Sequence, residues 1–263
     1  MGVASSIYRT LVNKSKGHQL RKFKIVRDLD KMIRTRIKSD FAIIQGSKMY
    51  LGDDDNYSLS IFGVHEPKET EIVKKEIEKG YTVLDLGASI GYYTLLFSRL
   101  VGNQGKVYSF ESNPNTFHIL EENIRMNGYT NVVLENKAVS NKNGESIIFH
   151  HKAQTVTLDS YFQIQDDDNI DFIKIDVEGH EKHVFEGMKE ILRKNPQVKI
   201  LFEFHPQVLA DYETKPQDLL NIIDKMNFQM FDILEDKPIS SNELLKMYPN
   251  KINPSTNIFC TRK

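Results

Sequence analysis

Short apolar runs alternate with longer amphipathic stretches along most of the chain. The apolar runs predict buried strands at 82–86, 106–110, 132–134, 170–175 and 198–204. The amphipathic stretches predict helices at 68–79, 92–100, 114–127, 180–193 and 217–226. Strands that alternate with helices in this way form βαβ units. The sequence therefore predicts an α/β fold with a mostly parallel central sheet and helices on both faces.

Other segments are predicted to be less regular. Residues 41–63 have the pattern of short strands and turns. Residues 145–151 and 155–158 are predicted to be edge strands or an excursion from the sheet, and two last strands lie near 230 and 258. Ligands of open parallel sheets bind beyond the carboxyl ends of the strands. The residues that follow each strand are therefore the first candidates for function.

The bulk composition narrows the class of protein. A chain of 263 residues that is 40% hydrophobic and 27% charged, with a mean hydropathy of -0.44, is expected to form a globular domain. The single cysteine, Cys260, excludes internal disulfides and clusters held by several cysteines. The sequence shows no membrane-length apolar run and no secretory signal. We therefore expect a cytoplasmic protein.

Charge is distributed unevenly although the net charge is only -1. Residues 1–40 contain 11 Lys and Arg against 3 Asp, so this segment has a charge of +8 and the rest about -9. We predict a basic helical arm over 1–40, followed by one domain over 41–263. The arm either packs on the domain or contacts an anionic surface, such as a membrane or nucleic acid. Membrane association is thus a second expected location.

A glycine-containing turn follows the first predicted strand of the regular part. It runs from Asp85 through Gly87 to Gly91, directly before a helix. Glycines let the backbone turn tightly and approach a ligand, and the helix N-terminus offers free amides. Glu111 follows the next strand, 20 residues past Gly91. That position suits a carboxylate that accepts both hydroxyls of a ribose.

The turn favours one nucleoside cofactor over another. A dinucleotide site requires Gly-x-Gly-x-x-Gly, whereas this chain has two glycines separated by three residues and Asp85 before them. S-adenosylmethionine (SAM) has no phosphates and carries a cationic sulfonium, so it tolerates an acid there. We expect Asp85 near its methionine part or bound waters. The alternative is a purely structural turn with Asp85 as a helix cap. After the third strand, Ala138 is expected to pack against the adenine.

The fourth and fifth strands end in polar residues suited to methyl transfer. Asp176 lies where the transferring methyl group is expected, followed by Glu178. Strand alternation predicts that Glu203 and His205 share one side. An acceptor oxygen must come within about 3 Å of the methyl group and lose its proton. His205 is the preferred base because imidazole titrates near neutrality, and Glu178 is the alternative.

These residues also leave other interpretations open. Buried carboxylates at a strand end need a cation, which could be a sulfonium, a metal or Lys174. Asp176 could instead cap the next helix, and His205-Pro206 could simply end the strand. His180 and His183 are spaced to share a metal, but no third ligand that zinc needs is evident. We predict no metal.

Five segments resemble one family in both order and spacing. They are Thr82–Thr94, Phe110–Pro114, Asn136–Ser140, Thr157–Asp159 and Ile173–Gly179. The chain is similar to FkbM-type methyltransferases over residues 66–233, and Lys-Ile-Asp-Val-Glu-Gly is the most specific motif. It departs from the family in having Ser89 in place of Asn, Ser112 in place of Pro, and a short stretch at 150–156.

The resemblance implies a class I (Rossmann-like) SAM-methyltransferase fold with a short N-terminal helical/β appendage. It implies SAM-dependent O-methylation of a sugar, glycan or natural-product-like hydroxyl, with S-adenosylhomocysteine as product. The candidate catalytic residues are His205, Glu178 and Asp176. The cofactor-binding candidates are Asp85, Gly87, Ala88, Ser89, Gly91, Tyr92, Glu111, Ser112, Asn113, Ala138 and Asp176. The alternatives are a SAM-binding protein without catalysis and a nucleic-acid methyltransferase, which the absence of an Asn-Pro-Pro-Tyr motif argues against.

Overall fold

The computed structural model describes residues 40–52, 59–148, 151–162, 169–249 and 255–262. The predicted basic arm over 1–40 lies outside the described residues except for Asp40. Among the residues that the structure describes, no helix is both long and apolar enough to cross a bilayer.

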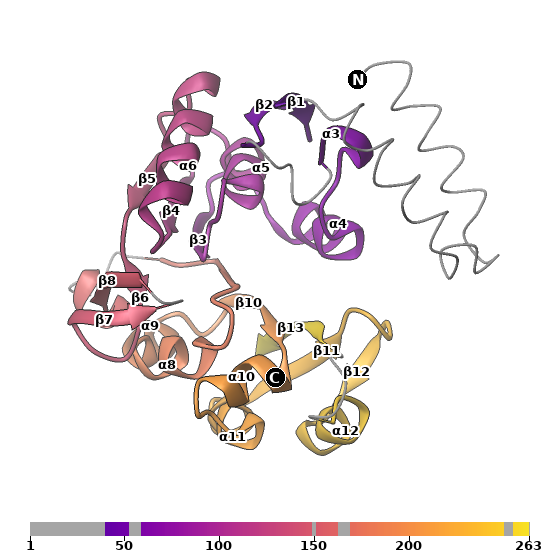
Figure 1. The fold of residues 1–263 in the computed structure, drawn as a ribbon. Coiled ribbons are helices and arrows are strands. Elements are labelled where there is room, and N and C mark those ends of the chain that lie inside the picture. Colours follow the sequence, from indigo (N-terminus) through magenta and orange to yellow (C-terminus); the bar gives the residue numbers. More distant parts are fainter. Residues whose placement is uncertain (1–39, 53–58, 149–150, 163–168, 250–254, 263) are drawn as a thin grey trace, which may run out of the picture.

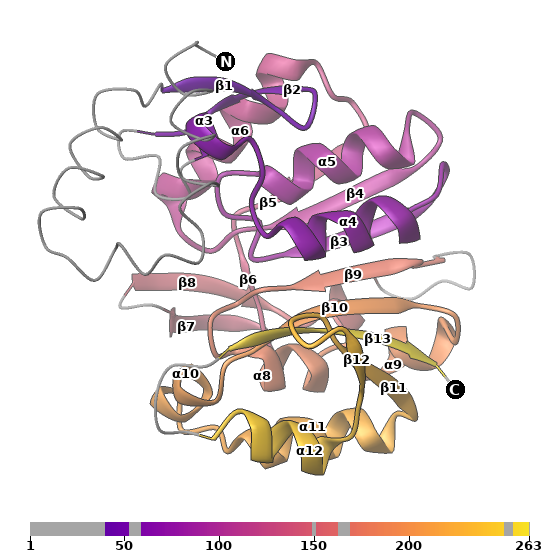
Figure 2. The same ribbon diagram turned by 90° about the vertical axis from the view of Figure 1, so that its right-hand side faces the viewer.

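An eight-stranded sheet forms the centre of the molecule (Figures 1 and 2). Five neighbouring strands are parallel, and three antiparallel strands extend one edge. The spatial order is β12 (Lys237–Ile239), β11 (Phe228–Asp232), β13 (Thr256–Arg262), β10 (Lys199–Phe204), β9 (Phe172–Ile175), β3 (Thr82–Leu86), β4 (Lys106–Phe110) and β5 (Val132–Glu135). The predicted α/β class with a mostly parallel sheet is confirmed.

The order of the strands reverses between β3 and β9. From β3 the chain moves outward through β4 to β5, and it then returns to place β9 and β10 on the other side of β3. At such a switch point the loops leave in opposite directions and open a crevice at the carboxyl ends of the strands. The turn after β3 and the residues after β9 therefore lie together.

Helices cover both faces of the sheet, and strand alternation decides which core each residue joins. Val83 packs under α4 (Pro67–Glu76), α5 (Tyr92–Val101) and α6 (Pro114–Asn127). Leu84 and Leu86 pack on the opposite side. That side is covered by α7 (Leu158–Tyr161), α8 (Glu181–Glu186), α9 (Lys189–Lys194), α11 (Pro216–Lys225) and α12 (Ser241–Met247), with α10 (Pro206–Asp211) beside them (Figure 1).

The predicted helix over 180–193 is helical at both ends but not continuous, because the chain forms α8 and α9 with a break between them. Gly187 ends α8 and lies against the backbone of Ser140, so that a side chain on Gly187 would collide with the Ser140 carbonyl. The break lets this segment pass the chain that leaves β5. Amphipathic periodicity does not reveal such a contact, since Ser140 lies 47 positions before Gly187.

The segment between β5 and β9 is not part of the central sheet. β6 (Ala138–Val139), β8 (His151–Val156) and β7 (Gly144–Ile148) form a separate three-stranded sheet, so the excursion was the right alternative and edge strands of the main sheet were wrong. The N-terminal hairpin of β1 (Phe41–Ile44) and β2 (Ser47–Tyr50) agrees with the predicted short strands. Residues 59–62, in contrast, form the short helix α3 (Leu59–Phe62).

Candidate functional site

A cavity of about 290 Å³ lies at the switch point. Its walls come from the glycine turn, the ends of β4 and β9, the start of α6, and the three-stranded sheet. The lining residues are Gly87, Ser89, Phe110, Glu111, Ser112, Asn113, Thr116, Lys137, Ala138, Val139, Ile148, His151, Asp176, Val177, Glu178 and His180. Predicted site residues from four separate stretches of the sequence thus line one cavity.

The glycine turn is held tightly against its neighbours. Gly87 has a φ of 85°, and a side chain there would collide with the carbonyl of Asp176. The amides of Gly87 and Ala88 both donate to the Phe110 carbonyl at 2.9 Å. Ser89 has a φ of 50°, a left-handed conformation that is uncommon outside glycine. The turn therefore needs glycine at 87 because backbone approaches it from β9.

Glu111 is fixed by two backbone amides. Its Oε2 atom accepts from the Ser89 amide at 2.9 Å, and its Oε1 atom accepts from the Asn113 amide at 2.7 Å. Burial raises the pKa of Glu111, while these two amides act in the opposite direction. Each carboxylate oxygen still has a lone pair for a ligand hydroxyl. The geometry suits the predicted contact with a ribose.

Four predicted cofactor residues do not line the cavity. Asp85 is 1% exposed and lies below the turn, where its Oδ2 atom accepts from Thr94 at 2.6 Å. Burial raises its pKa, and within the described part of the chain its Oδ1 atom has no hydrogen-bond partner. Ala88 is buried in the core before α5, Tyr92 is the buried first residue of that helix, and Gly91 caps it with a φ of 96°. Their contact with a cofactor stays a prediction.

Lys174 is the partner of Asp176. The Lys174 ammonium lies 2.8 Å from Asp176 Oδ2 and 4.6 Å from the centre of the Tyr93 ring, and the lysine is only 4% exposed. Burial lowers the pKa of Lys174, but the carboxylates of Asp176, Glu66 and Asp85 outweigh burial and raise it. From the sequence, a sulfonium, a metal and Lys174 were the candidate cations for the buried carboxylates. In the described structure Lys174 pairs with Asp176.

Glu178 and His180 follow β9 and face the same cavity. Glu178 has a φ of 45°, and the following Gly179 packs its backbone against Tyr212 and Val208. Burial and then the charge of Asp176 raise the pKa of Glu178, which His205 partly offsets. Burial, followed by His183, lowers the pKa of His180 to about 4, so its imidazole is neutral at pH 7.

His205 follows the end of β10 directly. β10 ends at Phe204, and His205 caps α10 with its Nδ1 atom, which accepts from the Val208 amide at 3.4 Å. Its backbone is still extended, with φ -123° and ψ 90°, and that it shares one side with Glu203 stays a prediction. A neutral imidazole that accepts at Nδ1 carries its proton on Nε2. His205 does not line the cavity, so its role as base stays a prediction.

The charges of the lining suit a cationic ligand without phosphates. The lining contains three carboxylates, Glu111, Asp176 and Glu178, against one lysine, Lys137. Lys137 is itself paired with Glu135 at 2.7 Å. A pyrophosphate would be repelled by such a wall, whereas a sulfonium is attracted to it. The residues present therefore fit SAM.

Comparison with known proteins places this domain in a family. The Methyltransferase FkbM domain matches residues 85–230, more than half of the 263 residues. The chain belongs to the FkbM methyltransferase family. Residues 85–230 form a SAM-dependent methyltransferase domain, and SAM is the cofactor of this domain.

Curated methyltransferases match shorter stretches of the chain. The C-methyltransferase UbiE of ubiquinone and menaquinone biosynthesis from Blochmanniella pennsylvanica is 38% identical over 77 residues, which is 29% of this chain and 30% of UbiE. A protein-L-isoaspartate O-methyltransferase from Methanococcoides burtonii is 34% identical over 59 residues, 22% of this chain. The match spans only 29% and 30% of the length of these two curated relatives.

A solved structure shares the fold. SMU.1697c from Streptococcus mutans, solved in complex with S-adenosylhomocysteine, superposes with a TM-score of 0.50 at 12% identity. The superposition covers 76% of this chain and 99% of SMU.1697c. At this identity the likeness concerns the fold alone.

The cavity at the switch point is also lined by residues that the sequence analysis did not predict for this site. Lys137 and Thr116 belong to segments next to predicted site residues. Ile148 and His151 come from the separate sheet, and His180 from the segment before α8. The pair of histidines at 150 and 151 was a visible signal, but only the tertiary structure brings His151 to the switch point.

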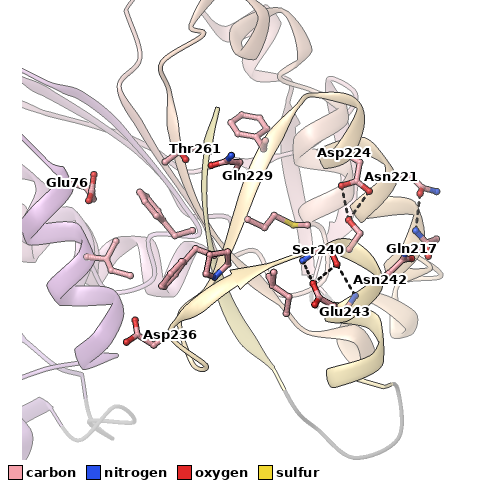
Figure 3. Close-up of a pocket in the computed structure, with 18 of the residues that line it drawn as sticks. Glu76, Gln217, Asn221, Asp224, Gln229, Asp236, Ser240, Asn242, Glu243 and Thr261 are labelled. Carbon is pink, nitrogen blue, oxygen red and sulfur yellow. Dashed lines mark hydrogen bonds between the residues drawn. The ribbon is translucent and has the colours of Figure 1, made fainter. Parts of the chain in front are cut away.

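A larger cavity of about 1030 Å³ lies at the antiparallel end of the sheet (Figure 3). Several of its polar groups are paired with one another. Glu243 accepts from the amide and hydroxyl of Ser240 at 2.9 and 2.6 Å, and Asp224 accepts from the Ser241 hydroxyl at 2.8 Å. Satisfied groups far from the switch point supply neither a cofactor site nor a base. We therefore assign the chemistry to the smaller cavity.

Metal binding finds no support in the described part of the chain. No three His, Cys, Asp or Glu side chains converge there as a metal site requires. The rings of His180 and His183 are 5.4 Å apart between centroids, and the described residues supply no third ligand beside them.

Proposed function

We propose that this protein is an O-methyltransferase that transfers the methyl group of SAM to a hydroxyl of a sugar, glycan or natural-product-like small molecule. One observation carries the proposal. Asp176 and Glu178 line the same cavity as Glu111 and the glycine turn. A carboxylate base and the cofactor-binding residues are thus within one enclosure, as proton removal coupled to methyl transfer requires.

Each residue of the cavity has its own proposed role in binding the cofactor. Glu111 would hold the ribose, the backbone at Gly87 and Ser89 would border the cofactor, and Ala138 would pack beside the adenine. SAM supplies, when bound, an electrophilic methyl group on a sulfonium. Asp176, anchored by the Lys174 ammonium at 2.8 Å, would present its carboxylate to that positive charge. Ser112 and Asn113 complete the wall next to Glu111.

Glu178 is our candidate for the general base, in preference to His205. A hydroxyl loses its proton as it becomes an ether, so a base must stand within hydrogen-bond reach. Glu178 lines the cavity, and burial raises its pKa toward the working pH. His205 lies outside the lining, and its Nδ1 atom is engaged by the Val208 amide.

The acceptor class follows from the same carboxylates. Carboxylate oxygens accept hydrogen bonds from hydroxyl groups, so an acidic wall favours an acceptor rich in hydroxyls. The same wall disfavours phosphate, which argues against a nucleic-acid acceptor.

The test combines a labelled-methyl assay with one pair of variants. The purified protein is incubated with labelled SAM and with sugars, glycosides, hydroxylated small molecules and an RNA oligonucleotide. Glu178→Gln should lower the turnover with the best acceptor by a factor of about 10² to 10⁴ while leaving S-adenosylhomocysteine affinity unchanged. Glu190→Gln is the matched control, since Glu190 is 54% exposed on α9 and its carboxylate forms an ion pair with Arg193.

The outcomes separate the parts of the proposal. Full activity of Glu178→Gln would return the role of base to His205 or Asp176. Transfer of label to RNA alone would refute the acceptor class. Binding of S-adenosylhomocysteine without transfer to any acceptor would favour a cofactor-binding protein that has no catalytic activity.

A further inference from the structure

The three-stranded sheet forms one side of the cavity, to which Ala138, Val139, Ile148 and His151 belong. β6 follows β5 directly, and it pairs with β8 with Ala138 opposite Thr155. Ala138, Ile148 and Ala153 form a small apolar cluster that joins all three strands. Two of these residues, Ala138 and Ile148, also line the cavity. The β7–β8 hairpin is therefore attached to the wall at which the adenine is expected.

His151 is the polar side chain that this hairpin brings to the cavity. It is the first residue of β8 and lies in the lining together with Glu111. Its Nε2 atom is shielded from water and has no hydrogen-bond partner within the described part of the chain. Burial raises the pKa of Glu111, and His151 is among the groups that act against this rise, so the two side chains are within electrostatic reach.

An unpaired buried nitrogen is costly to a folded protein. Burying a polar group without a hydrogen bond destabilises the fold by about 1–3 kcal/mol. Glu111 is already held by the amides of Ser89 and Asn113, so it needs no partner on the protein side. An imidazole left unpaired beside it, in a cavity that fits a nucleoside, indicates a partner on the bound ligand.

We propose that His151 is a further cofactor-binding residue that contacts the ribose hydroxyls of SAM together with Glu111. The β7–β8 hairpin would then cover the nucleoside from the side opposite the glycine turn. This inference rests on the position of the cofactor in the proposed function, and it adds a residue that none of the sequence motifs contains.

His180 also has a buried ring nitrogen without a hydrogen-bond partner among the described residues, but its surroundings differ from those of His151. Its Nε2 atom also lacks a partner among the described residues, yet its ring lies 4.4 Å from the Tyr212 ring and 5.4 Å from the His183 ring, centroid to centroid. These neighbours belong to α8 and to the residue after α10, and His180 is not among the groups that act on the pKa of Glu111. His151 is therefore the histidine that we assign to the ribose.

Calorimetric titration with S-adenosylhomocysteine tests the contact first. His151→Ala should weaken binding about tenfold, and His151→Gln, which keeps a hydrogen-bonding group, should recover part of that loss. The control is His118→Ala, because His118 is 72% exposed on α6 and lies outside the cavity. Equal affinity of wild type and His151→Ala would overturn the inference.

A comparison of two nucleosides locates the contact. With adenosine, His151→Ala should lose about the same factor as with S-adenosylhomocysteine. With 2′,3′-dideoxyadenosine, which has no ribose hydroxyls, wild type and variant should bind alike. An equal loss with both nucleosides would refute the ribose contact and leave only packing. If His151→Ala does not fold, the ¹⁵N shift of His151 in the wild type should change with adenosine and not with the dideoxy compound.

These measurements need no acceptor and no turnover. A protein with the predicted nucleoside pattern that methylates no hydroxyl would refute the proposed function and support the role of His151. A protein that methylates hydroxyls but binds both nucleosides equally well with and without His151 would refute only this inference. A wild type that binds no adenosine derivative would overturn both.

Discussion

The pair formed by Lys174 and Asp176 gives the sharpest prediction on stability. Lys174→Met keeps the length and apolar stem of the side chain and removes the ammonium. Lys174 is 4% exposed and 2.8 Å from Asp176, and the carboxylates of Asp85 and Glu66 also act on it. The substitution therefore leaves carboxylates near one another without their common cation.

Removing one partner of a buried pair costs about 3–5 kcal/mol, because the other charge stays buried and unpaired. Asp176 is 31% exposed, so water compensates part of its charge and we expect the low end, about 3 kcal/mol. For a domain of this size that corresponds to a fall in melting temperature of roughly 6–12 °C. Urea denaturation at pH 7, followed by circular dichroism, measures the change.

Two further variants determine whether the cause is electrostatic. Lys174→Met combined with Asp176→Asn removes both charges and should recover most of the lost stability. Lys75→Met is the control, since Lys75 is 81% exposed and 3.6 Å from Glu76; such surface pairs contribute less than about 1 kcal/mol. A loss below about 1 kcal/mol for Lys174→Met, or no recovery in the double variant, would refute the reasoning.

Two more predictions concern pH and the cofactor. Burial and then the charges of Asp176, Glu181 and Glu66 raise the pKa of Glu203 to about 8 from 4.5. The folded state therefore binds a proton that the unfolded state releases, and the free energy of unfolding should fall between pH 4.5 and 8. Urea titrations should show a flatter fall for Glu203→Gln than for the wild type. Stability that instead rises over this range would contradict the assignment. Glu111→Ala should weaken S-adenosylhomocysteine binding by at least tenfold in calorimetry without lowering the melting temperature by more than a few degrees, and unchanged affinity would exclude its contact with the ribose.

Local patterns in the sequence were sufficient to predict the parallel strands and the position of the cofactor site. The apolar runs predicted all five parallel strands, and the glycine turn with Glu111 pointed to the cavity. These features are readable because each depends on neighbours within one strand or one turn. The period of two along β3 even places Asp85 on the face of Val83, under α5, although the expectation put Asp85 at the cofactor.

Contacts between distant segments were decided by the tertiary structure. Gly187 breaks a predicted helix because it meets Ser140, and His205 is a helix cap because α10 begins directly after β10. His151 reaches the cavity only because β8 pairs with β6 outside the main sheet. The sequence by itself determined the alternation of strands and helices and the chemistry available at each strand end. Which of those groups meet, and which remain buried without a partner, depends on packing between residues far apart in the chain, and only the folded structure decided it.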